Sequence, residues 1–284
     1  MIVFPNAKIN LGLYVTSKRE DGYHNLETIF IPVEKLCDVL EVIPMPKGAT
    51  NDNFTVTGIP VPGSGGDNLC IKALGLMRKH FDIPYLDIYL HKVIPFGAGL
   101  GGGSSDAAFM LKLLNEQFDA GLTNNELETL ATEIGADCAF FIRNTTTYAE
   151  GIGNIFSPID IDISKLWIEL VIPPIHVSTA FAYKNITPRK PQTGLKTATQ
   201  SPFEDWHAQI SNDFEIPVFE QFPEIKTIKE DLYKHGAIYA SMSGSGSAVF
   251  GLFNEKPEIK WEKEYFVFSV ETRHALSLVS TSCK

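Results

Sequence analysis

A run of glycines between residues 97 and 103 constrains the fold of this chain more than any other feature. Five of those seven residues are glycine, and Ser104-Ser105-Asp106 follow them. Residues 86–90 alternate apolar and polar side chains and lead to Pro95, which predicts a strand that ends before the run. Residues 107–118 are strongly apolar and predict a helix. A glycine-rich turn between a strand and a helix lets backbone N–H groups converge beside the positive helix end, which is typical of a polyphosphate site.

Other interpretations of this segment are weaker. A flexible loop with a helix cap is the simplest, but such loops are seldom held between a strand and an apolar helix. Gly97, Gly99 and Gly102 fit the dinucleotide pattern G-x-G-x-x-G, which needs a second parallel strand with an acidic residue about 20 residues on. Residues 118–130 instead predict a turn and another helix. No lysine precedes Ser104 as in a Walker A loop, and the chain has no H-R-D or D-F-G string of a protein kinase.

Charge and composition limit the partners of the chain. Its 284 residues carry a formal net charge of −10 and no long basic run, which argues against a non-specific nucleic-acid binder. No apolar run reaches the roughly 18 residues of a membrane span, and the N-terminus does not resemble a secretory signal. We expect a cytoplasmic protein in which the four cysteines are reduced thiols; these are Cys37, Cys70, Cys138 and Cys283. Positive potential for a phosphate ligand must then come from local groups.

The remaining segments predict a mixed α+β protein. Strands are expected at 7–15, 36–43, 54–59, 86–90, 167–172, 248–253 and 266–272, and helices at 69–80, 107–118, 124–134 and 222–235. Thr123 and Glu126 form a capping-box pattern before the helix at 124–134. Residues 185–204 are polar with three prolines and are expected to form an exposed excursion. A divide between two parts is expected at about residues 150–165.

The strand at 7–15 carries two candidate polar residues. Its apolar residues at odd positions, from Ile9 to Val15, are expected on one face of a half-buried strand. Lys8 and Asn10 then share the opposite face and can serve a single site. Without further information, a solvent-facing lysine is the favoured interpretation of Lys8.

Four segments together resemble the GHMP kinases. P-F-G-A-G-L-G-G-G-S-S-D-A-A at 95–108 resembles their phosphate loop, G-A-D-C-A-F-F at 135–141 a second motif, and S-M-S-G-S-G-S-A-V-F-G at 241–251 their C-terminal glycine motif. A-K-I-N-L at 7–11, followed by R-E-D-G-Y-H-N-L at 19–26, is similar to the motif of the members that act on a cytidine-diphosphate-linked sugar alcohol. The resemblance spans residues 5–253. The departures are Asn6 and Ala139 where proline is usual and Asn154 where glutamate is common, and they concern loop geometry rather than chemistry.

This resemblance implies a fold and an activity. The fold is α+β and GHMP-kinase-like, with a ribosomal protein S5 domain 2-like domain over residues 1–155, a ferredoxin-like domain over 156–284 and a substrate cleft between them. The activity is phosphorylation of the 2-hydroxyl of 4-diphosphocytidyl-2-C-methyl-D-erythritol in non-mevalonate isoprenoid precursor biosynthesis, with ATP as phosphoryl donor and Mg²⁺. The expected partner is this small-molecule substrate, with no nucleic acid and no membrane, and the protein is a monomer or homodimer. A homoserine-type or mevalonate-type kinase and a non-catalytic nucleotide-binding module are the alternatives.

The resemblance also implies roles for single residues. Asp137 is the expected general base and Lys8 the cation beside it; a backbone-capping role is the alternative for Asp137. The expected ATP-binding residues are Asn68, Pro95, Phe96, Gly97, Ala98, Gly99, Leu100, Gly101, Gly102, Gly103, Ser104 and Ser105. The expected substrate-binding residues are Asn10, Tyr23, His24, Thr179, Tyr183, Gly244 and Ser245. Phe181 is the alternate to Tyr183 for stacking on the cytosine, and no carboxylate cluster is assigned to a metal.

Overall fold

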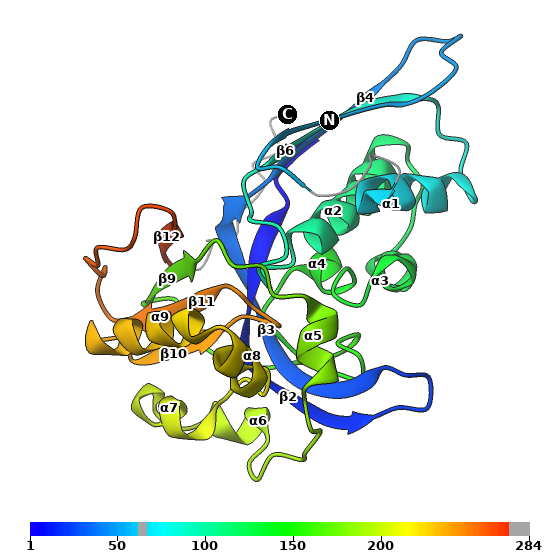
Figure 1. Ribbon diagram of the computed structural model, residues 1–284. Coiled ribbons are helices and arrows are strands. Elements are labelled where there is room, and N and C mark those ends of the chain that lie inside the picture. Colours follow the sequence, from blue (N-terminus) through cyan, green and yellow to red (C-terminus); the bar gives the residue numbers. More distant parts are fainter. Residues whose placement is uncertain (62–66, 273–284) are drawn as a thin grey trace, which may run out of the picture.

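The three sheets of this protein are joined by one long ribbon. The structure, a computed structural model, describes residues 1–61 and 67–272, so Cys283 lies outside the described residues. Within these ranges the strands form three four-stranded sheets. Figure 1 shows the first sheet with helices α1–α4 at one end, the third sheet with α8 and α9 at the other, and the β2–β3 ribbon running between them. No helix of the described part is long and apolar enough to span a membrane.

The first sheet supports the helix that follows the glycine run. Its strand order is β1-β4-β6-β5, antiparallel except for the parallel pair β5–β6. Alternate residues of β4 and β6, such as Leu40 and Ile88, are buried and pack with apolar side chains of α1 and α2 such as Met77 and Met110. The bounds are β1 Ile2–Val3, β4 Val39–Pro44, β5 Asn53–Gly58, β6 Leu86–Lys92, α1 Leu69–Arg78, α2 Gly102–Gln117, α3 Asn124–Ile134 and α4 Phe140–Arg143.

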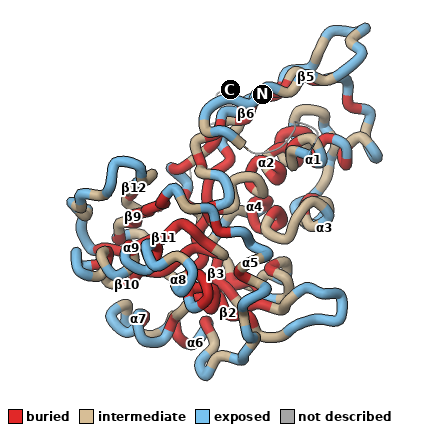
Figure 2. The backbone as a smooth tube through the Cα atoms, in the orientation of Figure 1, coloured by how far each residue is buried: buried red, intermediate tan, exposed pale blue. Residues whose placement is uncertain are grey.

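The second sheet, in the order β2-β3-β7-β8, lies at the centre of the molecule. Its longest strands are β2 and β3, and Figure 2 shows buried backbone along them and along the neighbouring strands β9–β11, as well as along α1 and α2. Residues 6–15 are all buried, so the expectation of a half-buried first strand was wrong. Both faces of this stretch are covered, because Ile9 and Leu11 pack in one apolar cluster with the third sheet, and Lys8 and Asn10 on the other face contact Gly99 and Ser243. The bounds are β2 Asn6–Lys18, β3 His24–Cys37, β7 Thr147–Glu150 and β8 Ile155–Pro158.

A bulge at Gly12 changes which face each residue of β2 presents. Gly12 has φ of 68°, and the register with β3 shifts between Leu11 and Leu13. Ile9 and Leu11 therefore pack in one apolar cluster, whereas Leu13 packs in another. The expectation that Ile9 to Val15 share one face was wrong because an extra residue in a strand reverses the two-residue alternation. As a result Leu13 lies on the side of Lys8 and Asn10.

The third sheet is antiparallel throughout, in the order β10-β11-β9-β12. Ile225, Ile228 and Leu232 of α9 pack with Val171 and Val249 of the sheet. The bounds are β9 Trp167–Ile172, β10 Tyr239–Met242, β11 Val249–Phe253, β12 Phe266–Glu271, α5 Thr179–Lys184, α6 Leu195–Ala198, η2 Phe203–Asp205, α7 Trp206–Gln209, α8 Glu215–Gln221 and α9 Pro223–Lys234.

Several local expectations can be compared with these bounds. The helix at 124–134 and its capping box of Thr123 and Glu126 are confirmed. The helix expected from residue 107 begins at Gly102, inside the glycine run. The excursion at 185–204 is not wholly exposed, because Leu195 and Ala198 of α6 are fully buried. Strand β3 was not predicted, since its residues do not keep a regular alternation.

Candidate active site

The glycine run forms a loop that ends at an open helix N-terminus. Gly97, Gly99 and Gly101 have φ of 67°, 77° and 71°, a left-handed region that residues with a Cβ seldom adopt. Gly101 is the N-cap of α2 and makes no side-chain capping bond. The first N–H groups of a helix have no acceptor within the helix, so those of α2 are available to an anion. The positive end of the helix dipole favours the same ligand.

Two cavities lie on either side of this loop. The larger, of about 730 Å³, is lined by the loop and by residues of the first sheet and α1. The smaller, of about 570 Å³, is lined by residues from both ends of the molecule. Gly97, Gly99, Gly101, Ser104 and Thr179 line both cavities. A group bound at the loop would therefore face both spaces.

The larger cavity collects nearly all the residues expected to bind ATP. Asn68 and residues 95–104 line it. Asn68 is also the N-cap of α1, where its Oδ1 accepts from the N–H of Cys70 at 2.9 Å. Ser105 is the exception, because it is fully buried and lines neither cavity. Successive residues of a helix point about a quarter-turn or more apart, so Ser104 and Ser105 cannot both face the loop.

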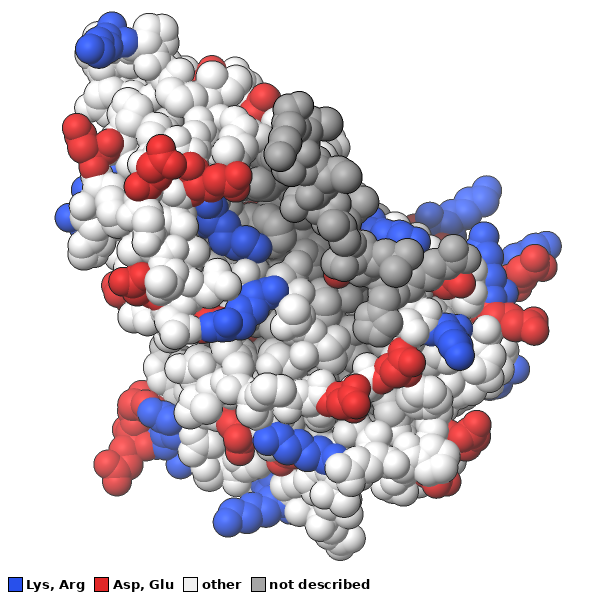
Figure 3. All heavy atoms as spheres, turned by 180° about the vertical axis from the view of Figure 1, so that it is seen from behind, with Lys and Arg blue, Asp and Glu red and all other residues white. Residues whose placement is uncertain are grey.

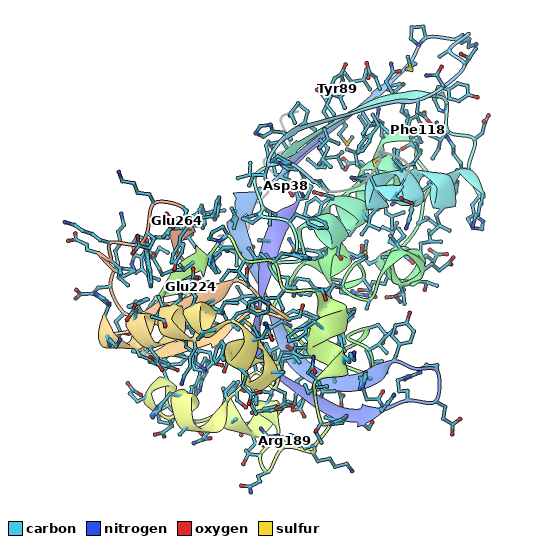
Figure 4. All side chains as sticks on the ribbon, viewed as in Figure 1. Asp38, Tyr89, Phe118, Arg189, Glu224 and Glu264 are labelled. Carbon is cyan, nitrogen blue, oxygen red and sulfur yellow. The ribbon has the colours of Figure 1, made fainter. Side chains whose placement is uncertain are left out.

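An apolar wall and one buried charge cluster complete the larger cavity. Its apolar lining residues are Phe54, Val56, Val61, Leu69, Ile94 and Phe96, and such a wall suits a flat base. Lys92 also lines it and was missed by the sequence reasoning; its Nζ donates to Asp38 and, at 2.6 Å, to Asp106. Burial lowers the pKa of Lys92, but the two carboxylates raise it by more. Figure 4 shows Asp38 where the first sheet meets the β2–β3 ribbon.

Lys8 and Asp137 meet in the smaller cavity beside the glycine loop. Lys8 Nζ lies 3.3 Å from Asp137 Oδ2, and the side chain of Lys8 is 3% exposed whereas that of Asp137 is 36% exposed. Lys8 Nζ also donates to Asn10 Oδ1 at 2.6 Å and to the carbonyl of Gly99 at 3.0 Å. The ammonium therefore has three acceptors, which offsets the cost of removing a charge from water. The carboxylate remains open to the smaller cavity, where it can accept a proton from a ligand.

Aromatic side chains line the far end of the smaller cavity. The rings of His24 and Tyr183 stack with centroids 5.1 Å apart and planes 27° apart. Phe214 meets the edge of Tyr183 at 4.8 Å. Tyr23 also lines this cavity and is 61% exposed. Phe181 packs against Phe222 instead, so Tyr183 is the aromatic residue of this segment that the cavity presents. Burial, and to a smaller extent the charge of Asp137, raises the pKa of Tyr183 to about 12.

The turn between β10 and β11 closes the same cavity. Gly244 and Ser245 line it, and Ser245 Oγ lies 3.2 Å from Thr179 Oγ1. Ser243 Oγ donates to the carbonyl of Gly99 at 2.9 Å. A Cβ at Gly99 would overlap the carbonyl oxygen of Ser243, so only glycine lets the turn and the phosphate loop touch through their backbones.

Comparison with known proteins identifies the family. Residues 68–145 match the model of the GHMP kinases N terminal domain, and residues 199–262 that of the GHMP kinases C terminal domain. The 4-diphosphocytidyl-2-C-methyl-D-erythritol kinase of Bacteroides thetaiotaomicron is 51% identical over 271 residues, which are 94% of this chain and 98% of the relative. This chain belongs to the GHMP kinases. Its resemblance to them is confirmed, and it is an ATP-dependent phosphotransferase with their two-domain α and β fold.

Other GHMP kinases agree with this assignment. The kinase of the same name from Parabacteroides distasonis is 52% identical, with 94% of this chain and 96% of the relative covered. A crystal structure of 4-(cytidine 5'-diphospho)-2C-methyl-D-erythritol kinase matches with a TM-score of 0.74 and 34% identity over 89% of this chain and 90% of that chain. The homoserine kinase of Cytophaga hutchinsonii shares the fold, with a TM-score of 0.69 at 14% identity over 95% of this chain and 96% of that chain.

Proposed function

We propose that this GHMP kinase transfers the γ-phosphoryl group of ATP to the 2-hydroxyl of 4-diphosphocytidyl-2-C-methyl-D-erythritol, a step in isoprenoid precursor biosynthesis. One observation carries the proposal: the smaller cavity extends from the aromatic pair His24 and Tyr183 to the Lys8–Asp137 pair beside the phosphate loop. A ligand with a base at one end and a hydroxyl at the other fits this arrangement. The names of the relatives support the same substrate.

The proton chemistry follows from the Lys8–Asp137 pair. The acceptor hydroxyl must lose its proton as the new P–O bond forms, and Asp137 is the carboxylate open to the cavity. Lys8 pairs with the ionised carboxylate and adds positive charge near the oxygen that becomes bonded to phosphorus. Because phosphoryl transfer depends mainly on positioning and charge stabilisation, these two residues need only hold the hydroxyl in line with the phosphate.

The phosphates would lie on the loop 97–104. The open N–H groups at the start of α2 and the helix dipole suit their negative charge. Ser104 lines both cavities beside this helix end, and Mg²⁺ accepts hard oxygen ligands such as a hydroxyl. A Mg²⁺ bound with ATP would neutralise charge on the phosphates. The apolar wall of the larger cavity is then the proposed adenine site.

The aromatic end of the smaller cavity is the proposed cytidine site. Stacking of a base on an aromatic ring contributes about 1–3 kcal/mol, and Tyr23 and Tyr183 both line the cavity. The side-chain amide of Asn10, the hydroxyl of Thr179 and the turn at Gly244 and Ser245 are the proposed contacts of the diphosphate and the sugar alcohol. An alcohol substrate without a nucleotide would leave the aromatic end unused.

An assay of ADP release across candidate acceptors tests this function. The purified protein, ATP and Mg²⁺ are combined with the cytidine-diphosphate-linked sugar alcohol, with mevalonate or with homoserine. We expect turnover with the first only, and ³¹P NMR of the product should place the new phosphate on the 2-hydroxyl. Turnover with mevalonate or homoserine instead would contradict the proposal.

The division of the chain is part of the same proposal. We propose that residues 1–155 form the nucleotide-binding part and residues 156–284 the second part, with the substrate between them. Strand β8 runs to Pro158 and pairs with β7, so the second sheet continues slightly past this division. A cytoplasmic location and a monomeric or homodimeric state stay predictions.

A further inference from the structure

The segment before α8 carries a buried amide that the proposed mechanism does not use. Asn212 is 2% exposed and lines neither cavity. Its backbone pairs with β2, since Leu13 donates to the carbonyl of Ser211 at 3.0 Å and Asp213 donates to the carbonyl of Leu13 at 2.8 Å. This short parallel pairing lies directly after the bulge at Gly12. Asn212 is therefore fixed to the central strand at the level of the smaller cavity.

The side-chain bonds of Asn212 reach two different walls of the site. Its Nδ2 donates to the carbonyls of Met242 and Gly244, both at 2.8 Å. Its Oδ1 accepts from the N–H of Phe214 at 3.0 Å. Two carbonyls on one side and an N–H on the other determine which amide atom is nitrogen and which is oxygen. All three bonds are satisfied only by an asparagine in this orientation.

The bonds of Asn212 connect the aromatic end of the smaller cavity with the turn beside the phosphate loop. Phe214 packs on Tyr183, which belongs to the aromatic end of the smaller cavity. Gly244 belongs to the turn that contacts the phosphate loop, where Ser243 Oγ donates to the carbonyl of Gly99. That carbonyl also accepts from Lys8 Nζ at 3.0 Å. A shift of the turn would therefore displace the carbonyl of Gly99, and with it the position of Lys8 Nζ, because both Ser243 and Lys8 donate to that carbonyl.

We propose that Asn212 is a positioning residue. It holds the β10–β11 turn against the phosphate loop and keeps that turn in a fixed position relative to the aromatic end of the smaller cavity. This inference rests on the proposed function, because its readouts are the turnover and binding of that substrate. Asn212 touches neither ATP nor the acceptor. It acts through Gly244 on one side and through Phe214 on the other.

An isosteric variant of Asn212 separates the effect of its bond to Phe214 from that of its bonds to the β10–β11 turn. Asn212→Asp keeps an oxygen to accept from the N–H of Phe214, but it loses both donors and places a carboxylate oxygen against two carbonyls. Since misplacement by about 1 Å can cost about 100-fold, we expect kcat to fall on the order of 10- to 100-fold. The affinity for CDP, measured by calorimetry, should stay within about threefold of the wild type, the pattern of a group used in the transition state. Asn212→Ala should lose both kcat and CDP affinity.

The control is another asparagine whose side-chain amide both donates to and accepts from the backbone. Asn115 donates to the carbonyl of Leu122 at 3.1 Å and accepts from its N–H at 2.8 Å, and it lines neither cavity. Asn115→Asp should lower the melting temperature without changing kcat at temperatures where the protein is folded. An Asn212→Asp variant that behaves in the same way would overturn the positioning role.

A second variant tests the contact if Asn212→Asp does not fold. Ser243→Ala removes the bond to the carbonyl of Gly99 and the longer bond from the N–H of Asn10 at 3.3 Å, and it leaves the three bonds of Asn212 intact. It should lower kcat with CDP affinity unchanged, and a wild-type kcat would overturn the coupling. If the wild-type protein itself shows no turnover with the substrate, the proposed function fails; if it turns over and both variants match it, only this inference fails.

Discussion

Lys8 illustrates how a single residue acquires its role from its neighbours. A lysine in an alternating strand most often faces water, yet Lys8 is 2% exposed. Its charge is accommodated because Asn10, the carbonyl of Gly99 and Asp137 all accept from it. An unpaired buried ammonium would cost several kcal/mol. Only Asp137 among these acceptors is charged and open to the cavity. Lys8 and Asp137 therefore provide a cation and a proton acceptor side by side.

The role of Asp137 leads to the first prediction. Asp137→Asn keeps the size of the side chain and an oxygen for Lys8, but an amide cannot take the proton of the acceptor hydroxyl. We expect kcat to fall on the order of 100-fold or more, the contribution of a general base, with little change in the melting temperature. Steady-state kinetics and thermal unfolding measure the two effects. Asp82→Asn, at an exposed position, is the control, and equal activity of the two variants would remove Asp137 from the mechanism.

His24 gives a prediction about pH. Burial, and secondarily the charge of Lys18, lower the pKa of His24, so the neutral ring persists at and above the ordinary histidine pKa of about 6.5. Neutral imidazole offers an acceptor for the cytosine edge, and the protonated ring offers none. Binding of cytidine should therefore be constant at neutral pH and weaken as the pH falls through the lowered pKa of His24.

A titration of cytidine binding at several pH values tests this expectation. Cytidine is preferred to CDP because it has no phosphate that titrates in the same range. His24→Gln keeps an acceptor and carries no titrating group, so its binding should show no such step. A step that survives in His24→Gln would mean that another group is responsible.

At the scale of elements, the site depends on a contact between two turns. The phosphate loop belongs to the first part of the chain, and the β10–β11 turn lies about 145 residues later, yet their backbones touch. Ala248 donates to the carbonyl of Ala98 at 3.1 Å, and Ser243 Oγ donates to that of Gly99. The loop is therefore held on one side by α2 and on the other by the β10–β11 turn, so its N–H groups are positioned before a ligand binds.

The contact leads to a prediction about Gly99. Gly99→Ala places a methyl group in overlap with the carbonyl of Ser243 at a φ of 77°, so the loop and the turn must separate. We expect ATP affinity to fall on the order of 10-fold or more because the phosphate cradle is displaced. Calorimetric titration with ATP measures this. Gly75→Ala is the control: Gly75 lies in α1 with no atom within 4 Å of the added Cβ, so it should keep ATP affinity and gain about 0.5–1 kcal/mol of stability.

At the scale of the whole molecule, one apolar cluster joins the central β2–β3 ribbon to the third sheet. Ile9 and Leu11 of β2 pack in the same cluster as Leu170, Tyr239 and Phe250 of the third sheet. β2 therefore completes the core of the third sheet, and β3 contributes to the cores at both ends, since Ile29 packs in this cluster and Phe30 in the cluster of the first sheet. Seen from behind in Figure 3, acidic and basic side chains are interspersed over the surface rather than gathered by sign. This face therefore shows no large patch of one charge.

The shared core predicts cooperative unfolding. All three tryptophans, Trp167, Trp206 and Trp261, lie in the second part of the chain, so their fluorescence reports that part, whereas far-UV circular dichroism reports helices and strands throughout. We expect both signals to change in one transition with the same denaturant midpoint. Two separated transitions would show that the parts unfold independently and would contradict the role given to β2.

What the sequence determined by itself was local. The glycine run, the helix at 124–134 with its capping box and the strands near 86–90 and 248–253 were predictable because each depends on residues close together in the chain. The motifs also pointed to Lys8, Asp137 and the phosphate loop as candidates. The resemblance to GHMP kinases supplied the link between them, which periodicity alone could not.

The tertiary structure decided which of these residues meet. The bulge at Gly12 brought Leu13 to the side of Lys8, the packing of α5 presented Tyr183 rather than Phe181 to the cavity, and helix geometry turned Ser105 away from it. Asn212 had no sequence signal, because the two bonds that it donates, to the carbonyls of Met242 and Gly244, join segments that lie far apart in the chain. Such contacts arise only when the chain has folded, since they depend on burial and on hydrogen-bond partners that no local pattern contains.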